Sequence, residues 1–369
     1  MSRILVVFGT RPEAIKLCPV VSELRKSVGV DVRVCVTGQH RELLDQVLRI
    51  SGITPDIDLD LMRHDQSLDR LTAAVLEELG PVLERECPDC VVVQGDTASA
   101  MAASLAAYYH KIPVAHVEAG LRSGDIHEPW PEEVARRVIS AIASYHFAPT
   151  RRAAAALLRE GVSENTIFVT GNTVVDALLA ARATLARDPG LVASLAPLVD
   201  KFADKRILLV TCHRRQTFGI GVEKIAHALL ELASRGDIGI VFPVHPNPNI
   251  RDGMDRKLSG HSSIALIEPQ DYLHFVRLLE LAYLILTDSG GVQEEAPVFG
   301  KPVLVMRDAT ERMESIDAGS ARLVGTSTDA IVSTASLLLD DADAYSAMAN
   351  TYSPFGDGLA AQRIAAVLS

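Results

Sequence analysis

Short runs of apolar residues alternate with segments of helical periodicity along most of the chain. The runs are rich in Val, Ile and Leu. Continuous apolar strands that alternate with amphipathic helices are typical of parallel sheets with helices on both faces. The predicted strands cover residues 4–8, 32–36, 90–93, 114–117, 146–148 and 167–169 in the first half, and 207–211, 238–243, 264–267, 284–287 and 302–306 in the second. The pattern predicts the doubly wound α/β class.

The alternation stops between about residues 185 and 205, where Pro189, Gly190 and Pro197 break the pattern. We interpret this stretch as a helical or irregular connector between two similar halves. We predict a Rossmann-like domain over residues 1–170, joined by a C-terminal helix within 355–369, and a second Rossmann-like domain over 171–354. We expect the two domains to face each other across a cleft. Because ligands bind beyond the carboxyl ends of parallel strands, the residues that follow each strand are the first candidates for function.

Composition narrows the class of partner. The chain has 369 residues, with 36 basic and 47 acidic side chains, a net charge of −11 and no long basic run. Nucleic-acid and membrane-surface binding are therefore disfavoured. No apolar stretch is long enough for a membrane span or a signal peptide, so we expect a cytoplasmic protein.

Five scattered cysteines do not form a disulfide framework. The one close pair is Cys87 and Cys90, which directly precedes an apolar run, so we expect Cys90 to begin a buried strand. The chain has no second pair of this spacing that would complete a zinc site.

Polar residues in the first half follow the predicted strands. Arg11 and Lys16 come after the first strand, where a helix start suits a diphosphate, although an ordinary turn with a solvated Lys16 explains them equally well. Asp96, Glu118 and Glu132 follow later strands or the next loop. Asp96 can cap a helix and Glu132 can stabilise a helix dipole, but three carboxylates at one sheet edge also suit acid–base catalysis.

The second half carries cationic and glycine-rich strand ends. His213 and Arg214 follow one strand, where they can meet a phosphate or form a solvated surface cluster. The turn Ser289-Gly290-Gly291 lies between a strand and a helix and predicts an anion nest. Glu295, further along that helix, can accept hydrogen bonds from ribose hydroxyls, and Arg312 is a candidate phosphate-binding residue.

Segments spread over the whole chain closely resemble those of the non-hydrolysing UDP-N-acetylglucosamine 2-epimerases. They are FGTRPEAIK (8–16), VTGQHRELLDQVL (36–48), HVEAGLRSGD (116–125), PWPEE (129–133), TGNTVVDAL (170–178), LTDSGGVQEEAP (286–297), GKPVLVMRDATER (300–312) and SPFGDG (353–358). The resemblance implies the GT-B fold, with two facing Rossmann-like domains.

The family's chemistry is what this resemblance implies. UDP-N-acetylglucosamine and UDP-N-acetylmannosamine interconvert by elimination of UDP to a 2-acetamidoglucal and re-addition of UDP, with no metal or redox cofactor. The reaction serves cell-surface polysaccharide synthesis, and the enzyme is a homodimer. The implied catalytic residues are Asp96, Glu118, Glu132, His213 and Lys16. The implied substrate contacts are Arg11, Arg136, Arg214, Phe275, Ser289, Gly290, Gly291, Glu295 and Arg312, and Gln39 and His40 match part of an effector site.

The chain departs from the family pattern at Cys212 and Gln216, which replace Gly and Glu, at Ala135, which replaces Asn, and at Met313, which replaces Pro. A modified UDP-N-acetylhexosamine is therefore an alternative substrate. Three alternative functions are a GT-B glycosyltransferase, a hydrolysing epimerase and a non-catalytic sugar-nucleotide sensor. The glycosyltransferase needs an acceptor, and the hydrolysing epimerase releases free N-acetylmannosamine.

Overall fold

The computed structural model describes residues 1–38, 41–61, 63, 66–214, 218–349 and 353–369. The chain divides into two compact units. Unit 1 contains Met1–Leu179 and Phe355–Ser369, and unit 2 contains Ala180–Pro354. Each unit is a parallel sheet with helices, so the predicted class of two doubly wound α/β domains is confirmed.

Unit 1 is built on a parallel sheet of seven strands in the order β3-β2-β1-β4-β5-β6-β7. The order reverses direction between β1 and β4, and such a switch point is where open α/β sheets bind ligands. The strands are β1 (Ser2–Phe8), β2 (Val30–Val36), β3 (Ile57–Asp58), β4 (Cys90–Gln94), β5 (Val114–Val117), β6 (Tyr145–Ala148) and β7 (Ile167–Val169). The helices are α1 (Arg11–Leu24), α2 (Arg41–Ser51), α3 (Leu68–Glu86), α4 (Ala98–Tyr109), α5 (Glu132–Ile142), α6 (Arg151–Arg159), η1 (Glu164–Thr166), α7 (Thr173–Arg187), which continues into unit 2, and α16 (Ala360–Leu368).

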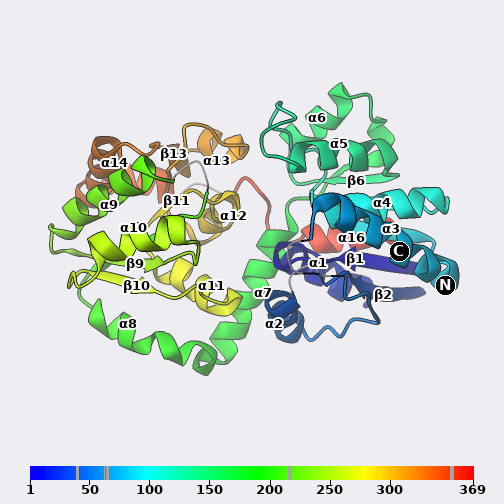
Figure 1. Cartoon of the computed structure of the whole chain (residues 1–369), viewed down its shortest axis with the longest axis horizontal. Coiled ribbons are helices and arrows are strands. Elements are labelled where there is room, and N and C mark those ends of the chain that lie inside the picture. Colours follow the sequence, from blue (N-terminus) through cyan, green and yellow to red (C-terminus); the bar gives the residue numbers. More distant parts are fainter. Residues whose placement is uncertain (39–40, 62, 64–65, 215–217, 350–352) are drawn as a thin grey trace. The chain divides into compact units, whose positions relative to one another are not determined.

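Successive side chains of β1 point to opposite faces of the sheet, and both faces are buried. Ile4 and Val6 pack with residues of α1, α2 and α16, whereas Leu5 and Val7 pack with residues of α3, α4 and α5. Figure 1 shows these helices on both sides of the β1 region, with the C-terminal helix α16 next to α1. Burial on both faces explains why the strands lack alternating polar residues.

Unit 2 repeats this arrangement with six parallel strands in the order β10-β9-β8-β11-β12-β13. The strands are β8 (Arg206–Thr211), β9 (Ile238–Pro243), β10 (Ile264–Ile267), β11 (Leu284–Thr287), β12 (Val303–Val305) and β13 (Ala321–Leu323). The helices are η2 (Pro189–Leu195), α8 (Ala196–Lys201), α9 (Ile220–Ala233), α10 (Pro248–Leu258), α11 (Tyr272–Leu281), α12 (Gly290–Glu295), η4 (Ala296–Phe299), α13 (Met313–Asp317), α14 (Thr328–Asp340) and α15 (Ala342–Ala349). Leu208 and Val210 pack with α9, α10 and α14 in one continuous core. The switch point of this sheet lies between β8 and β11.

The predicted strands are all present, and two edge strands were missed. These are β3 and β13, which have only two and three residues. The predicted connector after residue 185 is helical and contains η2 and α8. The chain passes from unit 1 to unit 2 inside α7, because Val174, Val175 and Leu178 are buried and Asp176 accepts hydrogen bonds from the first backbone N–H groups of α16.

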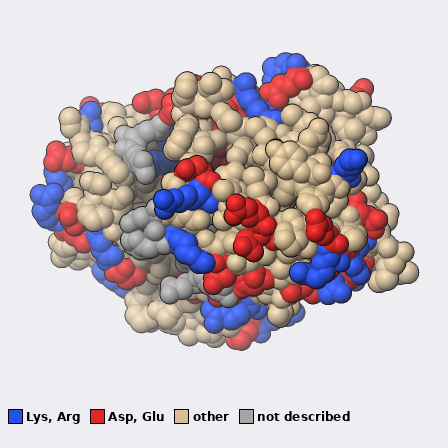
Figure 2. Space-filling view, turned by 45° about the vertical axis from the view of Figure 1, so that its right-hand side comes forward, with Lys and Arg blue, Asp and Glu red and all other residues tan. Residues whose placement is uncertain are grey.

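The surface carries both signs of charge. Figure 2 shows Lys and Arg interspersed with Asp and Glu on the face drawn. In the described part of the chain, no helix is long and apolar enough to cross a membrane. Cys90 is buried in β4 as predicted, and all five cysteines are free thiols.

Candidate active site

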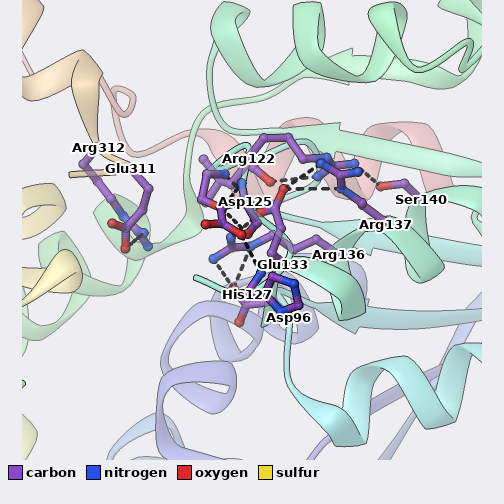
Figure 3. Close-up of polar contacts among 12 residues, drawn as sticks. Asp96, Arg122, Asp125, His127, Glu133, Arg136, Arg137, Ser140, Glu311 and Arg312 are labelled. Carbon is purple, nitrogen blue, oxygen red and sulfur yellow. Dashed lines mark hydrogen bonds and ion pairs between the residues drawn. The ribbon is translucent and has the colours of Figure 1, made fainter. Parts of the chain in front are cut away.

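Asp96 lies directly after β4 and is held by an arginine from α5. Nε and Nη2 of Arg136 donate to one oxygen of Asp96 over 2.9 and 2.6 Å, and Nη1 donates to Glu133 over 3.0 Å (Figure 3). Arg136 and Glu133 are buried, whereas Asp96 is partly exposed. Thr97, and not Asp96, is the N-cap of α4. The carboxylate of Asp96 therefore serves no capping role and is kept beside a buried cation.

Glu118 lies directly after β5 in a left-handed backbone conformation, with φ of 64°. This conformation is uncommon for a residue other than glycine and is often found at functional sites. Lys16 of α1 donates to Oε2 of Glu118, and Asn172, just before α7, donates to the same oxygen over 3.0 Å. The structure thus brings together the two predicted residues, Lys16 and Glu118, and adds a buried amide that the sequence did not point to.

A buried glutamate joins the loops that follow β1 and β4. Glu13 accepts from the backbone N–H groups of Gly9 and Thr10 over 3.0 and 2.8 Å, and from the Thr97 hydroxyl over 2.7 Å. Burial raises the pKa of Glu13, and the hydrogen bonds that it accepts oppose this shift. Glu13 therefore fixes the loop of Arg11 relative to the loop of Asp96.

Two predicted site residues of unit 1 offer polar atoms without partners. Oε2 of Glu132, at the start of α5, is buried and has no hydrogen-bond partner among the described residues. Arg11, in the first turn of α1, is partly exposed and makes no ion pair with any residue that the structure describes. A buried carboxylate oxygen is costly to leave unpaired, so Glu132 is the group best suited to receive a substrate hydrogen-bond donor or proton.

His116 of β5 joins the strand that carries Glu118 to the loop that carries Asp96. The ring is fully buried, and its Nε2 lies 2.7 Å from the carbonyl oxygen of Gly95. Burial lowers the pKa of His116 to about 3, so the ring is neutral at pH 7 and Nε2–H donates to that carbonyl. His116 thus fixes the relative position of the two strand ends.

In unit 2, His213 and Arg214 follow β8 and are held by Asp288, which follows β11. The backbone N–H groups of both residues donate to the Asp288 carboxylate over 2.9 Å, and Nδ1 of His213 lies 3.1 Å from it. Asp288 is fully buried, while the His213 side chain is 39% exposed. The edge of the His213 ring that carries Nε2 therefore faces away from Asp288.

Three arginines and two glutamates form a charge cluster beside these strand ends. Arg312 donates to Glu294 over 2.9 Å and to Glu311 over 2.6 Å (Figure 3), and Arg307 donates to Glu311 over 2.9 Å. Arg214 lies 3.5 Å from Glu311. Burial raises the pKa of Glu311, but the guanidinium groups of Arg312, Arg307 and Arg214 lower it to about 2.

Burial lowers the pKa of Arg214, and its neighbours Arg307 and Arg312 lower it further. The carboxylates of Glu311 and Asp288 oppose this shift. Arginines that cluster at strand ends are groups that can bind a diphosphate.

The turn that the sequence predicts as an anion nest leads into α12, and its two glycines have different surroundings. A side chain at Gly290 would come within 3.1 Å of the guanidinium carbon of Arg312, so this glycine makes room for the arginine. A side chain at Gly291 would meet no atom closer than 3.9 Å, so only Gly291 leaves its backbone open to a ligand. Ser289 is the N-cap residue, and its side chain makes no capping hydrogen bond.

The other predicted contacts of unit 2 lie on α11 and α12. Phe275 and Glu295 are both partly exposed, whereas Glu294, next to Glu295, is buried against Arg312. Gln39 and His40 lie outside the described residues. Within the described ranges, no group of three or more His, Cys, Asp or Glu side chains is arranged to hold a metal ion.

Five polar residues that support the site were not singled out from the sequence. Glu13, Glu133, Asn172, Asp288 and Arg307 are buried or nearly so and contact predicted site residues or their loops. One signal was present: Thr10 and Glu13 form a capping box, with the spacing that marks a helix start. Asn172 and Asp288 pair with residues distant in sequence, so no local pattern identifies them, whereas Glu133 and Arg307 pair with residues three or four positions away.

Two parallel-sheet α/β units with functional groups at their switch points define the GT-B-like class, to which solved structures similar to this chain also belong. A sequence model described as UDP-N-acetylglucosamine 2-epimerase matches residues 22–369. The chain belongs to the UDP-N-acetylglucosamine 2-epimerase family.

Similarity to members of this family extends over the full chain. The UDP-N-acetylglucosamine 2-epimerase of Yersinia pestis is 54% identical over 98% of this chain and 97% of its own length. That of Escherichia coli K12 is 52% identical over the same shares of both chains. The crystal structure of the UDP-GlcNAc 2-epimerase from Neisseria meningitidis, bound to UDP-GlcNAc, has a TM-score of 0.94 at 45% identity and covers 99% of both chains.

Proposed function

We propose that this protein interconverts UDP-N-acetylglucosamine and UDP-N-acetylmannosamine by inversion at carbon 2. The observation that carries this proposal is the match over 99% of both chains to a 2-epimerase with UDP-GlcNAc bound. We further propose the route of UDP elimination to a 2-acetamidoglucal, followed by re-addition of UDP after carbon 2 is reprotonated on the other face. The product would enter synthesis of a cell-surface polysaccharide.

The chemistry at carbon 2 is assigned to unit 1. The carbon–hydrogen bond at this position is not acidic, so it breaks only as the leaving group departs. Glu132 is the first candidate for the proton transfer, because its buried Oε2 has no partner among the residues described. Asp96 and Glu118 are ion-paired with Arg136 and Lys16. Carboxylates with these different partners suit an acid and a base that act on opposite faces of one carbon.

Stabilisation of the leaving UDP is assigned to the cationic strand ends of unit 2. Arg214, Arg307 and Arg312 lie together here, with the carboxylates of Glu294, Glu311 and Asp288 beside them. Preorganised positive charge where negative charge develops is a large catalytic term. We assign Arg11 and Gly291 to the phosphates as well, Glu295 to the ribose and Phe275 to the uracil. Arg136 uses its three guanidinium nitrogens on Asp96 and Glu133, so its main effect on the sugar is through Asp96.

Incubation with a single UDP-sugar tests the function. Each of the two UDP-sugars, supplied alone without an acceptor, should yield the same equilibrium mixture of both, as followed by anion-exchange chromatography. Release of free N-acetylmannosamine together with stoichiometric UDP would identify a hydrolysing enzyme. Turnover that starts only when a sugar acceptor is added would identify a glycosyltransferase.

We also propose that the active form is a homodimer in the cytoplasm, which the likeness to the family supports. Light scattering of the purified protein tests the assembly. A mass of two chains is expected, and a mass of one chain at the concentrations used for assays would refute the dimer.

A further inference from the structure

One buried carboxylate holds both the backbone and the ring of His213. Asp288 is fully buried and accepts from the backbone N–H of His213 and from that of Arg214, each over 2.9 Å. Its other oxygen lies 3.1 Å from Nδ1 of the His213 ring. These contacts leave the imidazole little freedom to rotate, because its anchor and its ring partner belong to the same side chain.

The strand ends around this pair are also joined. The backbone N–H of Asp288 donates to the Thr211 carbonyl over 3.2 Å, and the hydroxyls of Thr211 and Thr287 lie 2.6 Å apart. The ring of His245 stacks beside His213, with ring centroids 6.0 Å apart. The position of Asp288 is therefore set by the sheet itself.

The protonation state of Asp288 decides which His213 nitrogen carries hydrogen. Burial raises the pKa of Asp288, but hydrogen bonds from the His213 ring and from the two backbone N–H groups lower it to about 2. An ionised carboxylate only accepts hydrogen bonds, so Nδ1 of His213 must be the donor. In the neutral ring, Nε2 then carries the free lone pair.

We propose that Asp288 is a positioning residue, which fixes His213 as the Nδ1–H tautomer and reserves Nε2 for proton exchange with the substrate. This inference rests on the proposed function for the identity of the substrate. In the elimination, Nε2–H of the protonated ring would give its proton to an oxygen of the departing UDP. In the re-addition, Nε2 would take the same proton back, while Nδ1–H stays on Asp288 throughout.

The chain offers a matched control for this pair. In the same unit, Nδ1 of His274 lies 2.8 Å from Asp271, and the backbone N–H of His274 also donates to that carboxylate over 2.9 Å. Asp271 is the N-cap of α11, and asparagine caps a helix about as well as aspartate. Asp271→Asn therefore changes a similar aspartate–histidine pair that has no assigned catalytic role.

The test combines nitrogen NMR of histidine-labelled protein with steady-state kinetics. The wild-type His213 ring, assigned with His213→Gln, should carry hydrogen on Nδ1 at neutral pH. In Asp288→Asn, we expect the Nε2–H tautomer, a fall in kcat of about 10²- to 10⁴-fold, and a Kd for UDP within about threefold of wild type. Asp271→Asn should keep the wild-type kcat and the wild-type His213 signals.

Other results would overturn the proposal. A neutral wild-type His213 ring that carries its hydrogen on Nε2 and none on Nδ1 contradicts it without any variant, even if Asp288→Asn does not fold. A wild-type kcat in Asp288→Asn, or a lost kcat with an unchanged tautomer, would also contradict it. A wild-type enzyme that does not turn over UDP-N-acetylglucosamine would refute the proposed function instead, and the tautomer of His213 would still decide this inference.

Discussion

The two units share a strand order but carry opposite chemistry at the same edge of the sheet. In unit 1, the switch-point loops after β4 and β5 present the carboxylates of Asp96 and Glu118. In unit 2, the loops after β8 and β12 present His213 and Arg312. The fold fixes where the polar residues lie, and the residues in the loops decide what the edge can bind.

The balance of internal ion pairs also differs between the two edges. In unit 1, Asp96 and Glu118 each have a cation within the unit, and Glu132 has none among the described residues. In unit 2, three arginines lie beside the carboxylates of Glu294, Glu311 and Asp288. From this comparison we propose that residues of unit 1 transfer the proton at carbon 2 and that residues of unit 2 stabilise the leaving UDP.

The largest effect is expected when one acid of unit 1 is removed, which tests the assignment of proton transfer to this unit. We expect Asp96→Asn and Glu132→Gln each to reduce kcat by about 10²- to 10⁴-fold, because each removes a proton-transfer group or its charge. Calorimetric titration with UDP should show nearly unchanged affinity. Glu164→Gln, an exposed acid of unit 1, is the control and should retain full activity. Unchanged turnover in both site variants would refute the assignment.

The next test removes one cation of unit 2. Arg214→Ala should raise the Kd for UDP by about 10- to 100-fold, since a hydrogen bond to a charged group contributes about 1.5–3 kcal/mol. Arg214 is a cleaner choice than Arg312, whose loss would remove the ion-pair partner of the buried Glu294 and one of the partners of Glu311. Arg256→Ala, at an exposed arginine of α10, should bind UDP as wild type does. Equal affinity in the two variants would remove Arg214 from the phosphate site.

A smaller effect is expected at the ribose. Glu295→Ala should weaken UDP binding by about 3- to 10-fold, because a partly exposed hydrogen-bond acceptor contributes about 1 kcal/mol. A diphosphate compound that contains neither uracil nor ribose should bind the variant and the wild type equally. This result would separate a ribose contact from a phosphate contact. Full UDP affinity in Glu295→Ala would count against the ribose role.

The last prediction concerns stability, not activity, and belongs to unit 1. The pKa of His116 falls from 6.5 to about 3 on folding because the ring is buried. The unfolded chain binds a proton that the folded chain does not, so His116 contributes stability above pH 6.5 that is lost as pH falls toward 3.

His116→Gln keeps a donor for the Gly95 carbonyl and removes this titration. Between pH 6 and 4, the free energy of unfolding should fall by about 1.4 kcal/mol per pH unit less in the variant than in wild type. Urea unfolding followed by circular dichroism measures this difference. Parallel pH dependences of the two proteins would contradict a neutral buried His116.

The hydrophobic pattern predicted most of the fold because buried parallel strands are apolar throughout. It missed β3 and β13, since two or three residues at a sheet edge bury too little surface to produce a pattern. Candidate site residues were predictable where they directly follow a strand, as Asp96, Glu118 and His213 do.

The supporting residues were not predictable for a physical reason. Glu133 lies in the first turn of α5, where a local helix-dipole role explains it, yet it is fully buried against Arg136. Asp288 pairs with a residue 75 positions away, and Asn172 with one 54 positions away. The pairs of Asp288 and Asn172 depend on the sheet order and carry no local pattern.

The central claim is that carbon 2 of the sugar exchanges its proton with solvent during epimerisation. Proton NMR of the wild-type protein with UDP-N-acetylglucosamine in heavy water, with a chelator and no added cofactor, tests this most directly. We predict UDP-N-acetylmannosamine that carries deuterium at carbon 2, with the same label entering the recovered UDP-N-acetylglucosamine. UDP-N-acetylmannosamine that keeps its original hydrogen at carbon 2, or no epimer at all, would contradict the account.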